Sequence, residues 1–205
     1  MKILVTGFEP FGESRINPSQ MLVESLSEKS LSPAALITAI LPVDQSSAPE
    51  QLRALILTHQ PDAILSFGLA LGRAKVSLER VGLNLKDFRI PDNQGVTLSD
   101  QPIDPKGPAA YFSTLPLRAM LTALVKAGIP TELSLSAGAY LCNLILYTML
   151  HTLADSTPDI PAGFIHLPAL PEQAAEMDKP VPSMGFVTMQ KVADILLNEL
   201  TEISS

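Results

Sequence analysis

The sequence has few of the residues on which several classes of protein depend. A single cysteine among 205 residues excludes an internal disulfide and any metal site built from several cysteines. Lysine and arginine number 14 against 21 acidic residues, and the net charge of -7 argues against a general nucleic-acid binder, which usually needs a basic face. One cysteine and three histidines are therefore the candidate nucleophile and bases.

Long apolar runs are also absent. The run that begins at Met1 is stopped by Gly7 and is too short for a signal peptide, and no stretch approaches the length of a membrane-spanning helix. We therefore expect a soluble cytoplasmic protein with no membrane partner. With 46% hydrophobic and 17% charged residues and no internal repeat, residues 1–205 suit one compact domain with a sizeable core.

The first third of the chain alternates between strand and helix patterns. Short apolar runs predict strands over Lys2–Thr6, Ala35–Val43 and Asp62–Gly68. Between them, Asn17 can cap a helix that starts at Pro18. A second helix is expected from Asp44 to His59, where Pro61 ends it. This order predicts right-handed crossovers and an α/β fold with a mostly parallel sheet.

A charged pair interrupts the next apolar run. Lys75–Leu83 has the pattern of a strand, but Glu79 and Arg80 lie in its middle. Such charges are commonly solvated on an edge strand, and the alternative is a functional role. The polar segment Asn84–Asp104 is rich in turns, and Pro91–Gly95 suits a hairpin turn, so we expect an antiparallel arm beside the main sheet.

The remaining third of the chain continues the alternation without a domain boundary. The pattern predicts extended segments at Ala109–Ser113, Thr131–Ser134 and Gly163–Pro168, and helices at Leu115–Ala127 (ended by Gly128) and Phe186–Ile203. It also predicts a linker at Ser156–Pro161 and a proline-bounded irregular segment at Glu172–Met184.

The loop after the first strand nearly matches a phosphate-binding pattern. In Gly7–Ser14, Glu13 stands where that pattern needs a lysine, and a carboxylate would repel phosphates, so we reject nucleotide binding. Phe8 and Phe11 lie in the same loop. Loops after parallel strands form the usual ligand crevice of an α/β sheet, so these rings either contact a ligand or cap the core.

The lone cysteine stands at a strand–turn–helix junction. Leu133–Asn143 reads as a short strand and a turn of small residues, and an apolar helix continues through Leu150. Cys142 lies where this helix begins, and the positive end of a helix favours thiolate over thiol. The position suits a cysteine nucleophile, and the alternative is a small buried structural cysteine.

Helix geometry and sheet polarity separate the three histidines. His151 lies nine residues beyond Cys142 on the same helix, and steps of about 100° put it on the opposite face. His59 ends a crossover helix, at the sheet edge opposite the ligand crevice. His166 lies near the C-terminal end of a strand, at the edge where we expect the Cys142 helix to start. His166 is therefore the favoured partner, with a hydrogen-bonded core histidine as the alternative.

A cysteine–histidine pair usually needs a third group that fixes the imidazole tautomer. By pattern the best placed is Glu79, the acid embedded in an apolar strand. Four aspartates remain as alternatives, namely Asp62, Asp87, Asp92 and Asp104.

Several blocks of the chain, in order and spacing, resemble the pyroglutamyl peptidase I family, also called pyrrolidone-carboxylate peptidases. The resemblance covers essentially the whole chain. It rests on Val5–Gly12 with Asn17-Pro18, Ser77–Arg80 with Asn84, Arg89–Asn93, Tyr111–Pro116, Ser136–Gly138, Tyr140–Asn143 and Gly163–His166. It implies an open α/β/α sandwich in a single domain, a cytosolic location, no metal or other cofactor, and a homo-oligomer, often a tetramer.

The resemblance also implies a reaction and its residues. It implies a cysteine peptidase that removes an N-terminal pyroglutamyl residue from peptides through a thioester. The matching motifs imply Cys142 as nucleophile, His166 as general base and acid, and Glu79 as the group that orients the histidine. The further implied site residues are Arg89 in transition-state stabilisation and Phe8, Phe11 and Asn17 in substrate binding.

One loop departs from the family pattern. Leu69 and Leu71 stand in the segment Gly68–Arg73 where similar proteins have small residues, and Gly82 stands where alanine is usual. Two other functions therefore stay open. The chain can be an inactive family member or a non-catalytic α/β ligand-binding module, or a cysteine hydrolase of other amides or esters.

Overall fold

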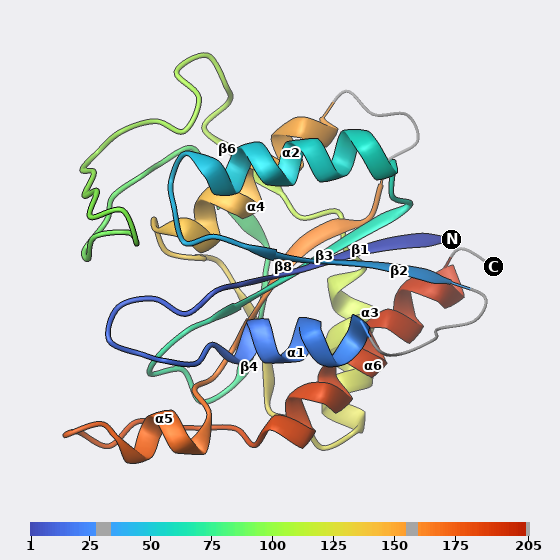
Figure 1. The fold of residues 1–205 in the computed structure, drawn as a ribbon. Coiled ribbons are helices and arrows are strands. Elements are labelled where there is room, and N and C mark those ends of the chain that lie inside the picture. Colours follow the sequence, from blue (N-terminus) through green and yellow to red (C-terminus); the bar gives the residue numbers. More distant parts are fainter. Residues whose placement is uncertain (28–33, 155–159, 204–205) are drawn as a thin grey trace.

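The computed structural model describes residues 1–27, 34–154 and 160–203. A six-stranded sheet in the order β2-β1-β3-β8-β4-β7 forms its centre, with helices on both faces (Figure 1). The strands are β1 (Lys2–Phe8), β2 (Ala35–Leu41), β3 (Ala63–Leu69), β4 (Val76–Glu79), β7 (Thr131–Ser134) and β8 (Ala162–Leu167). The predicted α/β sandwich with a mostly parallel sheet is confirmed.

The strands do not all run the same way. β2, β1, β3 and β8 are mutually parallel, whereas β4 pairs antiparallel with β8, and β7 pairs parallel with β4. β8, the last strand in the chain, is inserted between β3 and β4. β7 therefore runs opposite to β8, and the expectation that these two strands are parallel is wrong, although Cys142 still lies over Gly68, the β3 neighbour of His166.

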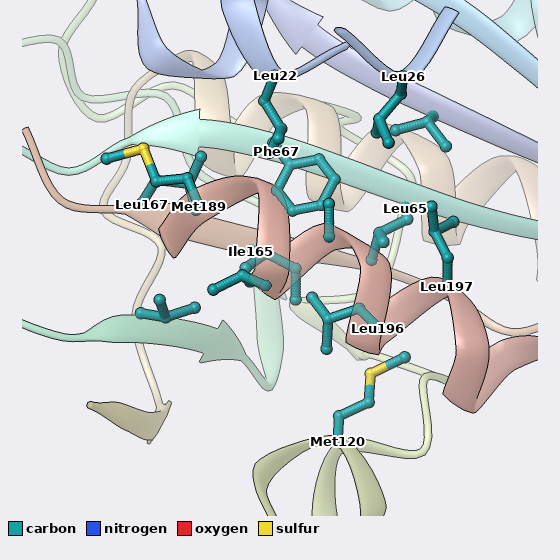
Figure 2. Packing of buried hydrophobic residues seen from close by; sticks show 14 of the residues in the cluster. Leu22, Leu26, Leu65, Phe67, Met120, Ile165, Leu167, Met189, Leu196 and Leu197 are labelled. Atoms are coloured by element: carbon teal, nitrogen blue, oxygen red, sulfur yellow. The ribbon is translucent and has the colours of Figure 1, made fainter. Parts of the chain in front are cut away.

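Two helical layers sandwich the sheet. The helices α1 (Pro18–Ser27), α3 (Leu117–Lys126) and α6 (Phe186–Ile203) cover one face, and α2 (Ser47–His59) and α4 (Leu141–Leu153) cover the other (Figure 1). The first face is apolar: Leu65 and Phe67 of β3 and Ile165 of β8 pack against α1, α3 and α6 (Figure 2). Among the described residues, no helix is long and apolar enough to cross a membrane.

The helix ends follow the expected capping residues. Asn17 Oδ1 accepts the Ser19 N–H at 3.0 Å, with Pro18 in the first helical position of α1. Asp44 Oδ1 accepts the N–H groups of Ser46 at 2.6 Å and Ser47 at 3.0 Å at the start of α2. The hydrogen bond from Ser47 is the main reason that the pKa of Asp44 is lowered.

The predicted strand at Lys75–Leu83 is two strands. β4 ends at Glu79, and β5 (Val81–Leu83) pairs antiparallel with β6 (Ala110–Phe112) in a separate small sheet. Because β4 lies inside the main sheet, the interpretation of Glu79 as a solvated edge charge is wrong, and its side chain is 0% exposed.

The predicted antiparallel arm forms no regular strands. In residues 84–104, Lys86 and Gln101 form an isolated antiparallel bridge, and Asp92 Oδ1 accepts the N–H groups of Gln94 and Val96 at the turn. Asn84 closes the base of the arm, since its Oδ1 accepts the N–H groups of residues 103 and 104. The antiparallel course is therefore fixed by these side chains together with backbone hydrogen bonds across the arm, such as Phe88 N–H to the Leu98 oxygen at 2.7 Å.

One further segment differs from the sequence prediction, and another lies mostly outside the described residues. The irregular segment Glu172–Met184 overlaps a short helix, α5 (Pro171–Ala175), before it becomes irregular. Most of the predicted linker at Ser156–Pro161 lies outside the described residues.

Candidate active site

The site lies on the sheet face covered by α4, where two adjacent strands bring an acid to a histidine. Glu79 of β4 pairs with Phe164 of β8, and Ser77 pairs with His166, so Glu79 and His166 are diagonal neighbours on one face. His166 Nδ1 lies 2.8 Å from Glu79 Oε1, and both side chains are buried. Because an ionised carboxylate only accepts hydrogen bonds, Nδ1 carries the proton and Nε2 keeps its lone pair.

Glu79 is ionised although it is fully buried. Burial by itself raises the pKa of this carboxyl, but the hydrogen bond and charge of His166, with hydrogen bonds from Ser134 and Arg73, outweigh burial and lower the pKa. Arg73 Nη1 donates to the same Oε1 at 2.6 Å. The other oxygen, Oε2, is buried without a hydrogen-bond partner among the described residues.

His166 is held in its neutral form. Burial lowers the pKa of the imidazole and outweighs the opposite effect of Glu79, and the nearby charge of Arg73 lowers the pKa further. A neutral imidazole with its proton on Nδ1 can accept a proton at Nε2, as a general base requires.

Gly68 of β3 lets the thiol approach this histidine. Gly68 pairs with His166 across the β3–β8 ladder. A Cβ atom at Gly68 would lie 3.0 Å from Cys142 Sγ and 2.7 Å from the ring of Phe164. The thiol therefore lies directly over Gly68, beside the histidine strand, and only glycine leaves room for it.

The electrostatics of the thiol differ from the sequence expectation. Cys142 is the second residue of α4, but burial raises its pKa to about 12, and the charge of Glu79 adds to the increase. The charge of Arg73 and the backbone N–H of Cys142 act in the opposite direction. The predicted lowering of the pKa by the helix terminus is thus outweighed by burial. The resting pair is a neutral thiol and a neutral imidazole.

The start of α4 has N–H donors without intrahelical partners next to the thiol. The first helical hydrogen bond of α4 runs from Leu144 N–H to the Tyr140 oxygen at 3.0 Å. The N–H groups of residues 141–143 therefore have no partner within the helix. Such donors are suited to an oxyanion that develops close to Sγ.

The other predicted site residues lie around this centre in different environments. Phe8 is buried 6.3 Å from the Phe164 ring, centroid to centroid, and Phe11 is half-buried 6.2 Å from Tyr140. Arg89 is exposed on the arm. The predicted roles of all three remain predictions.

The side chain of Asn17 forms its hydrogen bonds with other residues of the protein. It is 1% exposed, its Oδ1 accepts two hydrogen bonds from Ser19, and its Nδ2 donates to the backbone oxygen of Glu9 at 2.9 Å. These contacts fix the loop that carries Phe8 and Phe11. A direct role of Asn17 in substrate binding remains a prediction.

The alternative acids and histidine are engaged elsewhere. Asp104 Oδ2 lies 3.0 Å from His151 Nε2, and His151 Nδ1 lies 2.8 Å from the Tyr111 hydroxyl. Asp62 accepts the Lys2 N–H at 2.6 Å. Asp92 accepts hydrogen bonds from the arm turn. Glu79 is the acid that the structure brings to His166.

Two residues of the site escaped the sequence interpretation. Arg73 follows the loop after β3 and contacts Glu79, but no local pattern marks it as a partner of an acid in the next strand. Asn143, next to Cys142, is buried and binds the backbone of residues 83 and 85 through three hydrogen bonds of 2.8 to 2.9 Å. It ties the start of the arm to the nucleophile helix.

A partly buried thiol at a helix start, beside a buried imidazole and carboxylate on the strands of an open α/β/α sandwich, is typical of cysteine hydrolases. In the part of the chain that the structure describes, no group of three or more His, Cys, Asp or Glu side chains is placed to hold a metal ion. Residues 1–198 match the family model described as pyroglutamyl peptidase, Peptidase_C15. The chain belongs to the pyroglutamyl peptidase family.

Individual relatives cover nearly the whole chain. The pyrrolidone-carboxylate peptidase of Thermococcus onnurineus is 44% identical over 197 residues, which cover 96% of this chain and 97% of the relative. That of Vibrio vulnificus strain CMCP6 is 47% identical over 188 residues, covering 92% and 87%.

The fold matches solved structures equally well. A mutant pyrrolidone carboxyl peptidase from Pyrococcus furiosus has a TM-score of 0.96 at 38% identity and covers 100% of both chains. Pyroglutamyl peptidase I from Bacillus amyloliquefaciens has a TM-score of 0.91 at 36% identity, covering 97% of this chain and 93% of the other.

Proposed function

We propose that the protein removes an N-terminal pyroglutamyl residue from peptides, with Cys142 as nucleophile, His166 as general base and acid, and Glu79 as the group that orients the histidine. The observation that carries these roles is the 2.8 Å bond between His166 Nδ1 and Glu79 Oε1, next to a thiol seated over Gly68. Family membership supports the substrate class.

The reaction begins from the neutral pair. His166 Nε2 takes the thiol proton while Sγ of Cys142 attacks the carbonyl carbon that links pyroglutamate to the next residue. The N–H groups at the start of α4 stabilise the oxyanion, and Arg89 on the arm assists. His166 then gives its proton to the leaving amine as the C–N bond breaks, which leaves a thioester on Sγ.

Hydrolysis of the thioester restores the site. His166 takes a proton from water, the resulting hydroxide attacks the thioester carbonyl, and the sulfur leaves with that proton to release free pyroglutamate. Glu79 stabilises the imidazolium at each transfer without taking its proton.

A pyroglutamyl residue fits a binding pocket lined with apolar side chains. A pyroglutamyl residue has no free α-amine, so its binding needs no carboxylate for an ammonium group. Phe8 and Phe11 supply apolar surfaces for the flat lactam, and backbone groups supply the polar contacts. An ordinary charged N-terminus would be desolvated there without a partner, which excludes it.

A cytoplasmic homo-oligomer, either a dimer or a tetramer, is part of the proposal. Large apolar side chains exposed on the described surface support it, among them Phe112 at 70%, Leu135 at 68% and Val187 at 78%. Light scattering after size exclusion measures the state, and a monomer at micromolar concentration contradicts this part.

A panel of three chromogenic amides tests the function. The pyroglutamyl amide should be hydrolysed, and the matching prolyl and glutamyl amides should not. Cys142→Ser should still bind a pyroglutamyl peptide, but kcat should fall by about four orders of magnitude, because a hydroxyl is a far weaker nucleophile here. Activity on none of the amides indicates a binding module, and near-normal activity of Cys142→Ser contradicts the nucleophile.

A further inference from the structure

The guanidinium of Arg73 joins the acid of the site to the loop that delivers the thiol. Nη1 donates to Glu79 Oε1 at 2.6 Å, and Nη2 donates to the backbone oxygen of Ser136 at 2.8 Å. The side chain is 30% exposed, whereas Glu79 is 0% exposed. The reaction described above gives Arg73 no role.

The contact with Ser136 reaches the nucleophile through a series of short turns. Ser134 Oγ accepts the N–H of Ser136 at 3.2 Å. Ser136 Oγ in turn accepts the Gly138 N–H at 3.2 Å, and α4 with Cys142 begins three residues later. A side chain that holds Ser136 therefore holds the turn from which α4 starts.

Arg73 also balances the charge of Glu79. With Cys142 and His166 both neutral, the buried carboxylate of Glu79 is offset by the single positive charge of Arg73. An uncompensated buried charge is costly, and a nearby proton acceptor relieves it by taking a proton. Without Arg73, the group in contact with Glu79 that can do so is His166.

Among the described residues, the titratable and charged groups around His166 come from three elements. They are Glu79 on β4, Arg73 on the loop after β3, and Cys142 at the start of α4. Glu79 favours the protonated imidazole and Arg73 opposes it. At the thiol the same two charges act in the reverse sense, since Glu79 disfavours the thiolate and Arg73 favours it.

We propose that Arg73 is a positioning residue of the reaction. It offsets the charge of Glu79 so that His166 stays unprotonated and free to accept the thiol proton, and it holds the turn that precedes α4. This inference rests on the proposed function, because it assigns a role in the same site.

Two substitutions separate charge from geometry. R73Q removes the charge, and R73K keeps it but cannot hold Glu79 and Ser136 at once with a planar fork. Arg118→Gln is the matched control, since it removes one exposed positive charge from α3 on the other face of the sheet. The readouts are the pH profile of kcat/KM and the NMR titration of the His166 ring.

R73Q should raise the titration midpoint of His166 by about one pH unit or more. The acidic limb of the kcat/KM profile should move to higher pH by the same amount. At pH values below the limbs of both the wild type and R73Q, kcat/KM should therefore fall about tenfold or more. R73K should lower kcat but leave the midpoint and the limb at their wild-type positions. Arg118→Gln should change neither quantity.

Two results would overturn the inference. One is an R73Q protein that loses activity evenly at all pH values while the His166 midpoint stays unchanged, which indicates a purely structural residue. The other is a midpoint shift of a full unit in R73K, which is decisive even if R73Q does not fold. The NMR titration needs no turnover, so it tests Arg73 independently of whether the amide panel supports the proposed function.

Discussion

The two faces of the central sheet are built from the same strands but differ in kind. On the face under α1, α3 and α6, Leu65 and Phe67 of β3 and Ile165 of β8 lie in one continuous apolar cluster (Figure 2). Leu78 of β4 belongs to the same cluster. On the face under α4, the alternate positions of these strands include Ser66, Gly68, Ser77, Glu79, Phe164 and His166.

This difference follows from the two-residue period of a strand. Successive side chains point to opposite faces, so one strand can supply core and chemistry at once. Because the apolar face is complete by itself, the other face can hold a buried acid and its partners. We therefore expect substitutions on the two faces to separate stability from activity.

The largest expected effect comes from the acid. Glu79→Gln should lower kcat by about a thousandfold or more, because an amide no longer fixes the Nδ1 tautomer of His166 or stabilises its imidazolium. Hydrolysis of the pyroglutamyl amide measures this loss. The proton on Nε2 of the wrong tautomer would also block the general base.

Leu65→Ala, from the other face of β3, is the matched control. It should destabilise the protein by about 2 to 5 kcal/mol through the cavity that it leaves, with kcat nearly unchanged at a temperature where the protein is folded. Denaturant unfolding measures this cost. The comparison of the faces fails if Leu65→Ala lowers kcat as much as Glu79→Gln does.

A smaller loss of kcat is expected for a substitution at Gly68, directly below the nucleophile. In Gly68→Ala the new Cβ would lie 2.7 Å from the Phe164 ring and 3.0 Å from Cys142 Sγ, so the thiol must move. Displacement of a reacting group by a fraction of an ångström should cost about ten- to a hundredfold in kcat. Ala63→Gly, buried at the start of the same strand, is the control for a change in backbone freedom. Unaltered kcat in Gly68→Ala would show that the thiol does not need this position.

The smallest effect concerns a polar pair that is not part of the reaction. Thr6 and Ser66 share a buried 2.7 Å hydrogen bond on the α4 face. Ser66→Ala should cost about 1 to 3 kcal/mol because it leaves Thr6 without its partner, whereas the double change with Thr6→Val should recover most of that stability. Thermal unfolding of both variants measures the coupling. A Ser66→Ala variant with lowered kcat would place this pair in the reaction.

Much of the fold and part of the site could be predicted from the sequence. The helix at Phe186–Ile203 begins and ends as predicted, and the helix start at Cys142 follows from a small-residue turn before an apolar run. These features are local, since capping residues, turns and hydrophobic periodicity lie within a few residues of each other. The structure places His166, the histidine that the sequence favours, on the strand beside Gly68, over which the Cys142 thiol lies, and its catalytic role remains a prediction.

The errors at the site concern long-range relations. Nothing local to Glu79 signals that β4 is inserted antiparallel beside a strand from the end of the chain, so its burial could not be predicted. Arg73 was missed because its partners, Glu79 and Ser136, come from other elements. The thiol pKa was predicted in the wrong direction because burial of Cys142 depends on the packing around it, and the helix terminus alone does not determine it.

The position of β8 has a consequence for biosynthesis. Its residues, 162–167, fill the gap between β3 and β4, which are made much earlier. Until that segment leaves the ribosome, both neighbouring strands have an open hydrogen-bonding edge, and such edges readily pair with other chains. A nascent chain that stalls before residue 162 should therefore be prone to aggregation and free of enzymatic activity, which makes any termination that comes before β8 costly to the cell.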